Sequence, residues 1–113
     1  MTDAPTCTGI YSDEWLAQLS KRAFYVSYRG RGGVKGVTLR FGDEPALPLR
    51  LPTRAEKSVS AVILEDDDFL KVLASARLRL QVVTVLDNVL TDDIALTGLR
   101  AAHDFIATNA ACQ

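Results

Sequence analysis

The segment Arg77–Leu86 constrains the fold most, because its apolar residues recur at every second position. Side chains alternate between the two faces of a β-strand, so this pattern predicts a strand with one buried face. The inward face would carry Leu78, Leu80, Val82, Thr84 and Leu86. Similar patterns at 23–29 and 37–41 predict two further strands. Half-buried strands of this kind are typical of antiparallel sheets.

The remaining strands are expected to be shorter. Alternating leucines predict a strand at 47–51, which Pro48 and Pro52 restrict to a sheet edge or to a strand end. With 23–29 and 37–41, this strand would form an antiparallel three-stranded meander. Two others are expected at 58–64, with Val59, Ala61 and Ile63 on one face, and at 94–97.

Helices complete the expected fold. Ser12 and the two acids that follow it are typical of a helix N-terminus, so a short helix is predicted at 13–20. A second helix is predicted at 66–76, where acidic residues precede apolar residues at helical spacing. A C-terminal helix is expected after Gly98, with Leu99, Ala102, Phe105 and Ile106 on one face. The fold class is therefore α+β: an antiparallel β-sheet or small β-sandwich with one mid-chain helix and a C-terminal helix.

The length of 113 residues suits a single domain over 1–113, with an irregular segment at 1–11. The apolar fraction of 48% and the charged fraction of 24% are typical of a globular protein and exclude collagen-like and low-complexity classes. No apolar run approaches the roughly 20 residues that a membrane-spanning helix needs. We therefore expect no membrane span.

The net charge of −1 conceals an uneven distribution of charge along the chain. Residues 21–57 have nine basic and three acidic side chains, a net charge of +6. Residues 1–20 have a net charge of −3 and residues 58–113 a net charge of −4. We therefore expect a polarised domain whose basic segment could meet an acidic partner.

The most basic stretch combines aromatic and Arg-Gly residues, and its candidate contacts are Tyr25, Tyr28, Arg29, Arg31 and Lys35. Rings beside arginines are typical of proteins that bind single-stranded nucleic acid. The same residues also suit a glycine-rich hairpin tip between two strands, with solvated charges. Since tyrosine and arginine are frequent at binding hot spots, we expect this tip to contact another protein.

Catalytic chemistry has little support in the sequence. The only histidine, His103, is expected on the surface of the last helix, without an adjacent nucleophile. The glycines near residue 30 are not followed by the Lys-Ser/Thr of a phosphate-binding loop. One histidine and two cysteines do not suffice for a zinc site made by this chain alone, and the acids at 65–68 are interpreted as helix caps. We expect a protein that is not an enzyme and that has no metal and no cofactor.

Cys7 and Cys112 lie near the two ends of the sequence. A disulfide between them would close a loop of about 100 residues and could add up to about 4.7 kcal/mol of stability. The alternative is a pair of unrelated free thiols. The first residues lack the pattern of a signal peptide, which fits both a mature exported chain and a cytosolic protein.

The C-terminal segment has a pattern of Ile94, Leu96, Gly98, Leu99 and Ala102, followed by Cys112. This segment resembles the ends of the VasI-like proteins associated with type VI secretion and, more distantly, of the invasion-associated locus B family. The resemblance extends back through 69–86. It implies a small exported proteobacterial protein in which this segment closes a β-sandwich, and it implies no catalytic residues.

The function expected from the sequence is that of a small non-enzymatic module, exported to the periplasm or secreted, that binds another protein. A secretion-system accessory, an inhibitor or an immunity protein would fit. The alternative is a cytosolic nucleic-acid-binding or regulatory domain that uses the same basic loop.

Overall fold

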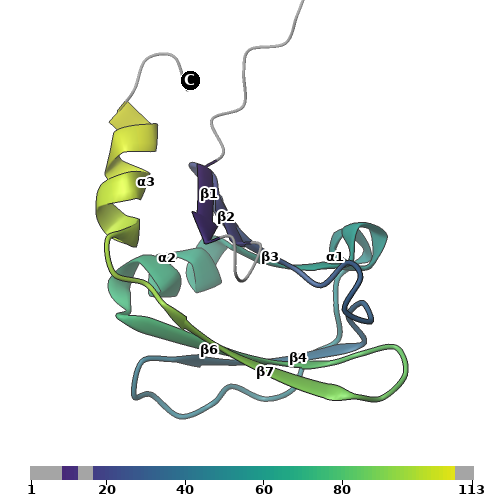
Figure 1. Cartoon of the computed structure of the whole chain (residues 1–113). Coiled ribbons are helices and arrows are strands. Elements are labelled where there is room, and N and C mark those ends of the chain that lie inside the picture. The colour runs from purple at the N-terminus through teal and green to yellow at the C-terminus, as the bar shows by residue number, and fades with distance from the viewer. Residues whose placement is uncertain (1–8, 13–16, 109–113) are drawn as a thin grey trace, which may run out of the picture.

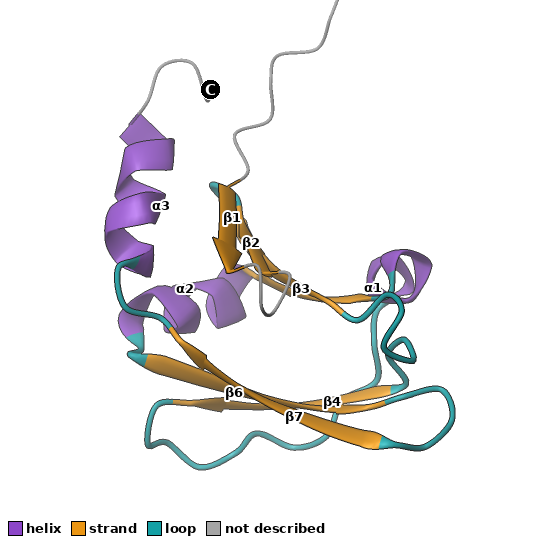
Figure 2. Ribbon diagram, in the orientation of Figure 1, coloured by secondary structure: helices purple, strands orange, loops and turns teal. Residues whose placement is uncertain are grey.

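The computed structural model describes residues 9–12 and 17–108 and has the expected α+β architecture (Figures 1 and 2). Seven strands and three helices are found in these residues. The strands are β1 (Gly9–Ser12), β2 (Ala17–Leu19), β3 (Ala23–Ser27), β4 (Gly36–Phe41), β5 (Ala61–Glu65), β6 (Arg77–Val83) and β7 (Val89–Ala95). The helices are α1 (Arg54–Val59), α2 (Asp66–Ala74) and α3 (Leu99–Thr108).

The strands form two antiparallel sheets. The four-stranded sheet has the order β1-β2-β3-β5, and the three-stranded sheet has the order β4-β6-β7. The two sheets lie in separate layers, with α2 at one end and α1 at the other (Figure 2). Their inward side chains belong to one hydrophobic cluster, which includes Phe24, Val26, Val62 and Leu64 from the first sheet and Leu39, Leu78, Leu80 and Val82 from the second.

The alternation that predicted the strand at 77–86 is confirmed over most of its length. Leu78, Leu80 and Val82 are buried on β6, and the residues between them are exposed. The strand ends at Val83, and Leu86 lies exposed in the turn to β7. Because β6 and β7 form a hairpin, the last strand is longer than predicted and begins at Val89.

The predicted three-stranded meander is wrong. β3 pairs with β2 and β5, whereas β4 pairs with β6, so the two strands lie in different sheets. The segment 47–51 is not a strand and contributes one isolated bridge, between Arg50 and Val37. Both sides of β3 are occupied by other strands, so the chain crosses to the second sheet instead of folding back as a hairpin.

The predicted strand at 58–64 begins too early, because residues 54–59 form α1. The Thr53 side chain accepts a hydrogen bond from the Glu56 N–H, and the Glu56 carboxylate accepts one from the Thr53 N–H. This reciprocal capping box stabilises the start of a short helix. Ser60 ends the helix in a left-handed conformation, with φ of 53°. The inward face of β5 consequently carries Val62 and Leu64, and Val59 is exposed.

The predicted helix at 13–20 is wrong where it can be compared, since Ala17–Leu19 is strand β2. Residues 13–16 lie outside the described residues. The buried-exposed-buried order of β2 is that of a strand, and pairing with β1 and β3 overrides the capping signal.

The mid-chain helix and the C-terminal helix are confirmed as α2 and α3. On α3, Leu99 and Ile106 are buried, whereas Ala102 and Phe105 are exposed, so its contact face is narrower than predicted. No helix within residues 17–108 has the length and apolar character needed to cross a membrane.

Candidate functional site

The connection between β3 and β4, residues 28–35, carries most of the predicted contact residues but is not a free hairpin tip. It passes between the start of β5 and the turn that joins β6 to β7. A Cβ on Gly32, whose φ is 109°, would lie 2.9 Å from the Thr84 Cβ, so only glycine fits this close approach without a shift. Three backbone hydrogen bonds hold the connection: Tyr28 N–H to Ser60 O (2.8 Å), Lys35 N–H to Val83 O (2.7 Å) and Val85 N–H to Gly32 O (3.0 Å).

Tyr28, predicted as an exposed anchor, is fully buried. Its hydroxyl donates a hydrogen bond of 2.6 Å to Oδ2 of Asp92, a buried carboxylate on β7. Arg31 donates from both terminal nitrogens to the two oxygens of Asp92, at 3.0 and 3.1 Å. The Arg31 guanidinium also lies 4.8 Å from the centre of the Tyr28 ring. Tyr28 and Arg31 therefore attach the connection to the three-stranded sheet; the Tyr28 ring is buried and the Arg31 charge is paired with Asp92.

The electrostatics of this cluster agree with its geometry. Burial, followed by the hydrogen bond to Asp92, raises the pKa of the Tyr28 hydroxyl above its ordinary range. The hydroxyl therefore remains a donor to the carboxylate. The hydrogen bond to Asp92 raises the pKa of Arg31, although partial burial opposes the rise.

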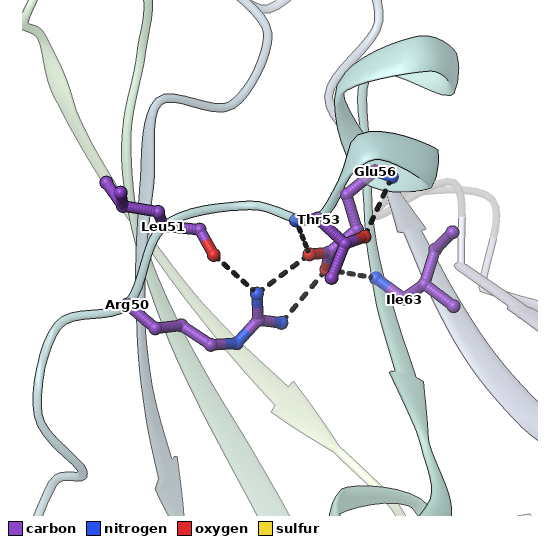
Figure 3. A network of polar contacts seen from close by, with 5 residues as sticks. All are labelled: Arg50, Leu51, Thr53, Glu56 and Ile63. Carbon is purple, nitrogen blue, oxygen red and sulfur yellow. Dashed lines mark hydrogen bonds and ion pairs between the residues drawn. The ribbon is translucent and has the colours of Figure 1, made fainter.

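A second buried carboxylate, Glu56, organises the segment before α1 (Figure 3). Its Oε1 accepts hydrogen bonds from Arg50 Nη1 (2.7 Å) and the Thr53 N–H (2.9 Å), and its Oε2 accepts from Arg50 Nη2 (2.9 Å) and the Ile63 N–H (2.8 Å). Arg50 Nη1 also donates to the carbonyl oxygen of Leu51 at 3.2 Å. One carboxylate thus joins the 50–53 segment, α1 and strand β5.

Glu56 is fully buried, yet its four donors keep it ionised. Burial alone would raise the pKa of this carboxyl. The hydrogen bonds from Arg50 and from the backbone of Ile63 and Thr53 outweigh burial and lower the pKa below its ordinary value.

A groove is lined by residues of the β3–β4 connection, the segment before α1, α1 itself and the β6–β7 turn. Figure 1 shows α1 and the β6–β7 turn at the same end of the molecule. The volume of the groove is about 430 Å³. Apolar side chains form much of its wall, and Leu51 (76% exposed) and Val85 (64% exposed) remain accessible to solvent. The groove is lined by Gly33, Val34, Lys35, Leu51, Pro52, Lys57, Ser60 and Val85.

The charged side chains that line the groove are both lysines. Lys35 is about half exposed and pairs with Asp87 of the β6–β7 turn. No ion pair of Lys57 is found within the described part of the chain. Val59 and Leu86, which adjoin the groove residues Ser60 and Val85 in sequence, are also exposed. The groove therefore combines apolar surface with positive charge.

The other predicted contact residues do not gather at one place. Tyr25 is half-buried on β3, at the position opposite Ile63 of β5. Arg29 is exposed at the start of the connection. Of the five predicted contact residues, Lys35 is the one that lines the groove. Cys7 and Cys112 lie outside the described residues.

His103 is partly buried and joins α3 to the turn between β2 and β3 and to α2. Its Nε2 lies 2.8 Å from the Lys21 carbonyl oxygen, and its ring meets Phe69 edge to face at 5.3 Å. Within residues 17–108, no cluster of three or more His, Cys, Asp or Glu side chains could hold a metal ion.

Two structural features, and the groove itself, were not predicted from the sequence. The Thr53-Arg54-Ala55-Glu56 segment has the capping-box spacing and could have revealed α1. Asp92 lies between Leu90 and Ile94 on the inward side of its strand, where a carboxylate needs a partner. The groove itself joins segments far apart in sequence, and no local pattern marks it.

Comparisons with known proteins give no relative for this chain: no family model, curated protein or solved structure matches it.

Proposed function

We propose that this chain is a small non-enzymatic module that binds another protein through the groove. The observation that carries the proposal is a largely apolar groove whose charged lining residues are Lys35 and Lys57. Binding sites are typically concave and mostly apolar, with a few charged groups that orient the ligand.

The charges of the groove indicate the chemistry of its partner. Lys57 has no ion pair among the described residues, whereas Lys35 is paired with Asp87 of the neighbouring turn. The Lys35–Asp87 pair is exposed and therefore weak, so a carboxylate of a partner can compete for this lysine. We therefore expect a peptide segment with one bulky apolar side chain flanked by Asp or Glu. Burial of a leucine-sized side chain contributes about 1.5–3 kcal/mol, and the acids add attraction and orientation.

Binding of nucleic acid through the same connection is less well supported. Base stacking needs an accessible ring, and Tyr28 is buried against Asp92. The Arg31 charge is already paired with that carboxylate. These observations favour a protein partner.

The groove can be tested with two fluorescent peptide pools, in which a central Leu or Phe is flanked either by Asp and Glu or by Lys and Arg. We expect the acidic pool to bind and the K35E/K57E variant to lose about tenfold or more of that affinity, because two attractive charges become repulsive. Fluorescence anisotropy measures the binding. K21E, which reverses an exposed lysine remote from the groove, is the matched control. Equal binding of both pools, or equal loss in K21E, would contradict the proposal.

We further propose that the module is exported to the periplasm or secreted. This proposal is supported by the cysteines near the two sequence ends and by the resemblance of the C-terminal segment. In protein isolated from its native host, mass spectrometry without reductant should find Cys7 bonded to Cys112. Two free thiols in that preparation would count against both the disulfide and export.

A further inference from the structure

A charged hollow, separate from the groove, lies on the outer face of the three-stranded sheet. Here β4 and β6 present the side chains that alternate with their buried residues. Register places Arg40 directly opposite Arg79, and Thr38 directly opposite Gln81. With Ala46, these four residues line a hollow of about 210 Å³ without an acidic side chain.

The facing arginines are an unusual pair, because like charges directly opposite each other destabilise a sheet. Arg79 donates one hydrogen bond of 2.9 Å, from Nη2 to Asp93 on β7. Asp93 also lies 3.6 Å from Arg77, so one carboxylate is shared between two arginines. Arg40 has no carboxylate within salt-bridge distance among the described residues.

Most of the donors of these two arginines remain available. A guanidinium has five N–H donors in a planar fork. Arg40 uses its Nε–H, which donates to the Glu44 carbonyl oxygen at 3.0 Å. Arg79 uses one terminal nitrogen for Asp93. Within residues 17–108, the terminal nitrogens of Arg40 and the remaining nitrogens of Arg79 have no protein acceptor.

The nearest acids lie on one side of the arginine pair only. Asp43 and Asp93 line the adjoining hollow of about 250 Å³, together with Arg40, Gly42, Arg77 and Arg79. The acid-free hollow lies on the other side of the Arg40–Arg79 pair, next to Thr38 and Gln81. An anion seated there would relieve the repulsion between the two arginines and accept their free hydrogen bonds.

We infer that the hollow between Arg40 and Arg79 binds a phosphate monoester or a free phosphate ion. A phosphate group has about −1.5 to −2 charges near neutral pH and three acceptor oxygens, which suits two guanidinium forks. Thr38 and Gln81 supply a hydroxyl and an amide beside them. This site does not depend on the groove or on its peptide partner.

The test titrates the ¹⁵N-labelled full chain with sodium phosphate, and separately with a pentapeptide that has a central phosphoserine, against sodium chloride of equal ionic strength. We expect saturable shifts of the Arg40 and Arg79 Nε–H signals and of the amides at 38–40 and 79–81. The R40Q/R79Q variant should lose about tenfold or more of the affinity, because two charge-assisted contacts disappear. R100Q, which removes an exposed charge on α3, should bind as the unchanged protein does.

The two ligands distinguish the source of the phosphate. Tighter binding of the phosphopeptide supports a phosphorylated protein as ligand, and tighter binding of inorganic phosphate supports the free ion. Shifts spread over basic residues elsewhere, or unchanged affinity in R40Q/R79Q with native-like spectra, would overturn the site. A response to a single-stranded oligonucleotide without any response to phosphate would also overturn it.

Discussion

Replacement of Glu56 with alanine is expected to lower the free energy of unfolding by about 3–5 kcal/mol, since it leaves a partly buried cation without its partner. The change removes all four hydrogen bonds of the carboxylate and half of the capping box. A domain of this size has only about 5–15 kcal/mol of total stability. Chemical denaturation followed by circular dichroism measures the loss. Glu44, an exposed residue without a side-chain hydrogen bond among the described residues, provides the control E44A.

The conservative variant E56Q isolates the role of the charge. Every group that contacts the carboxylate is a donor, so the glutamine NH₂ group must face two N–H donors in either orientation. We therefore expect E56Q to be destabilised nearly as much as E56A. A loss in E56Q no larger than that in E44A would show that the network does not stabilise the fold.

The lowered pKa of Glu56 also gives a direction for the dependence of stability on pH. The unfolded chain takes up this proton near the ordinary value of 4.5, whereas the folded protein takes it up at a lower pH. The contribution of Glu56 is thus fully present above the unfolded pKa and is lost as the pH falls through the folded pKa. E56Q should show a shallower loss of stability in acid than the unchanged protein.

Replacement of Asp92 with alanine should lower the free energy of unfolding by about 3 kcal/mol, because a buried hydroxyl and an arginine lose their acceptor. Y28F removes one hydrogen bond to a charged group and should cost about 1.5–3 kcal/mol. The two losses are expected to be non-additive in the double variant, because both remove the same contact. D104A, which changes an exposed acid on α3, is the control. Additive losses would mean that the Tyr28–Asp92 bond does not couple these residues.

A titration at alkaline pH tests the same cluster independently. The raised pKa of Tyr28 means that its stabilising contribution is present below the ordinary value of 10.0 and is lost as the pH rises toward the folded value. In ultraviolet absorbance, one of the three tyrosines should therefore ionise only as the protein unfolds. Y28F should remove that delayed component and leave the others.

The sequence predicted the elements whose signals are local. Leu78, Leu80 and Val82 alternate on β6 because one face of the strand meets the core and the other meets solvent. Phe69 and Val72 mark the buried side of α2 at helical spacing. In these elements, burial alone decides the pattern.

Strand pairing could not be predicted, because it depends on contacts between distant segments. The predicted meander joined strands that are neighbours in sequence. In the structure β3 pairs with β5, although β4 and α1 lie between these two strands in the sequence. Val59 was assigned to a strand because it alternates with Ala61 and Ile63, whereas the Thr53–Glu56 capping box places it at the end of a helix. Local capping and long-range pairing outweigh the intrinsic preference of a single residue.

The candidate site was predicted only in part. Lys35 was identified as a contact residue and lines the groove, but Tyr28 and Arg31 bind Asp92, which lies more than 60 residues away. The contact with Asp92 forms only in the folded protein, so the local sequence predicted Tyr28 and Arg31 as exposed contact residues. The net positive charge of 21–57 is likewise reduced in the fold by Asp87 and Asp92, which pair with Lys35 and Arg31 from outside that segment.

The most direct test of the proposed binding groove is an NMR titration of the ¹⁵N-labelled protein with the tightest-binding acid-flanked peptide. The account predicts that the largest amide shifts fall at Gly33–Lys35, Leu51, Lys57–Ser60 and Val85, and that K35E/K57E lowers the affinity obtained from these shifts about tenfold or more. Saturable shifts confined to another face of the protein, or shifts in the groove with the same affinity in K35E/K57E, would contradict it.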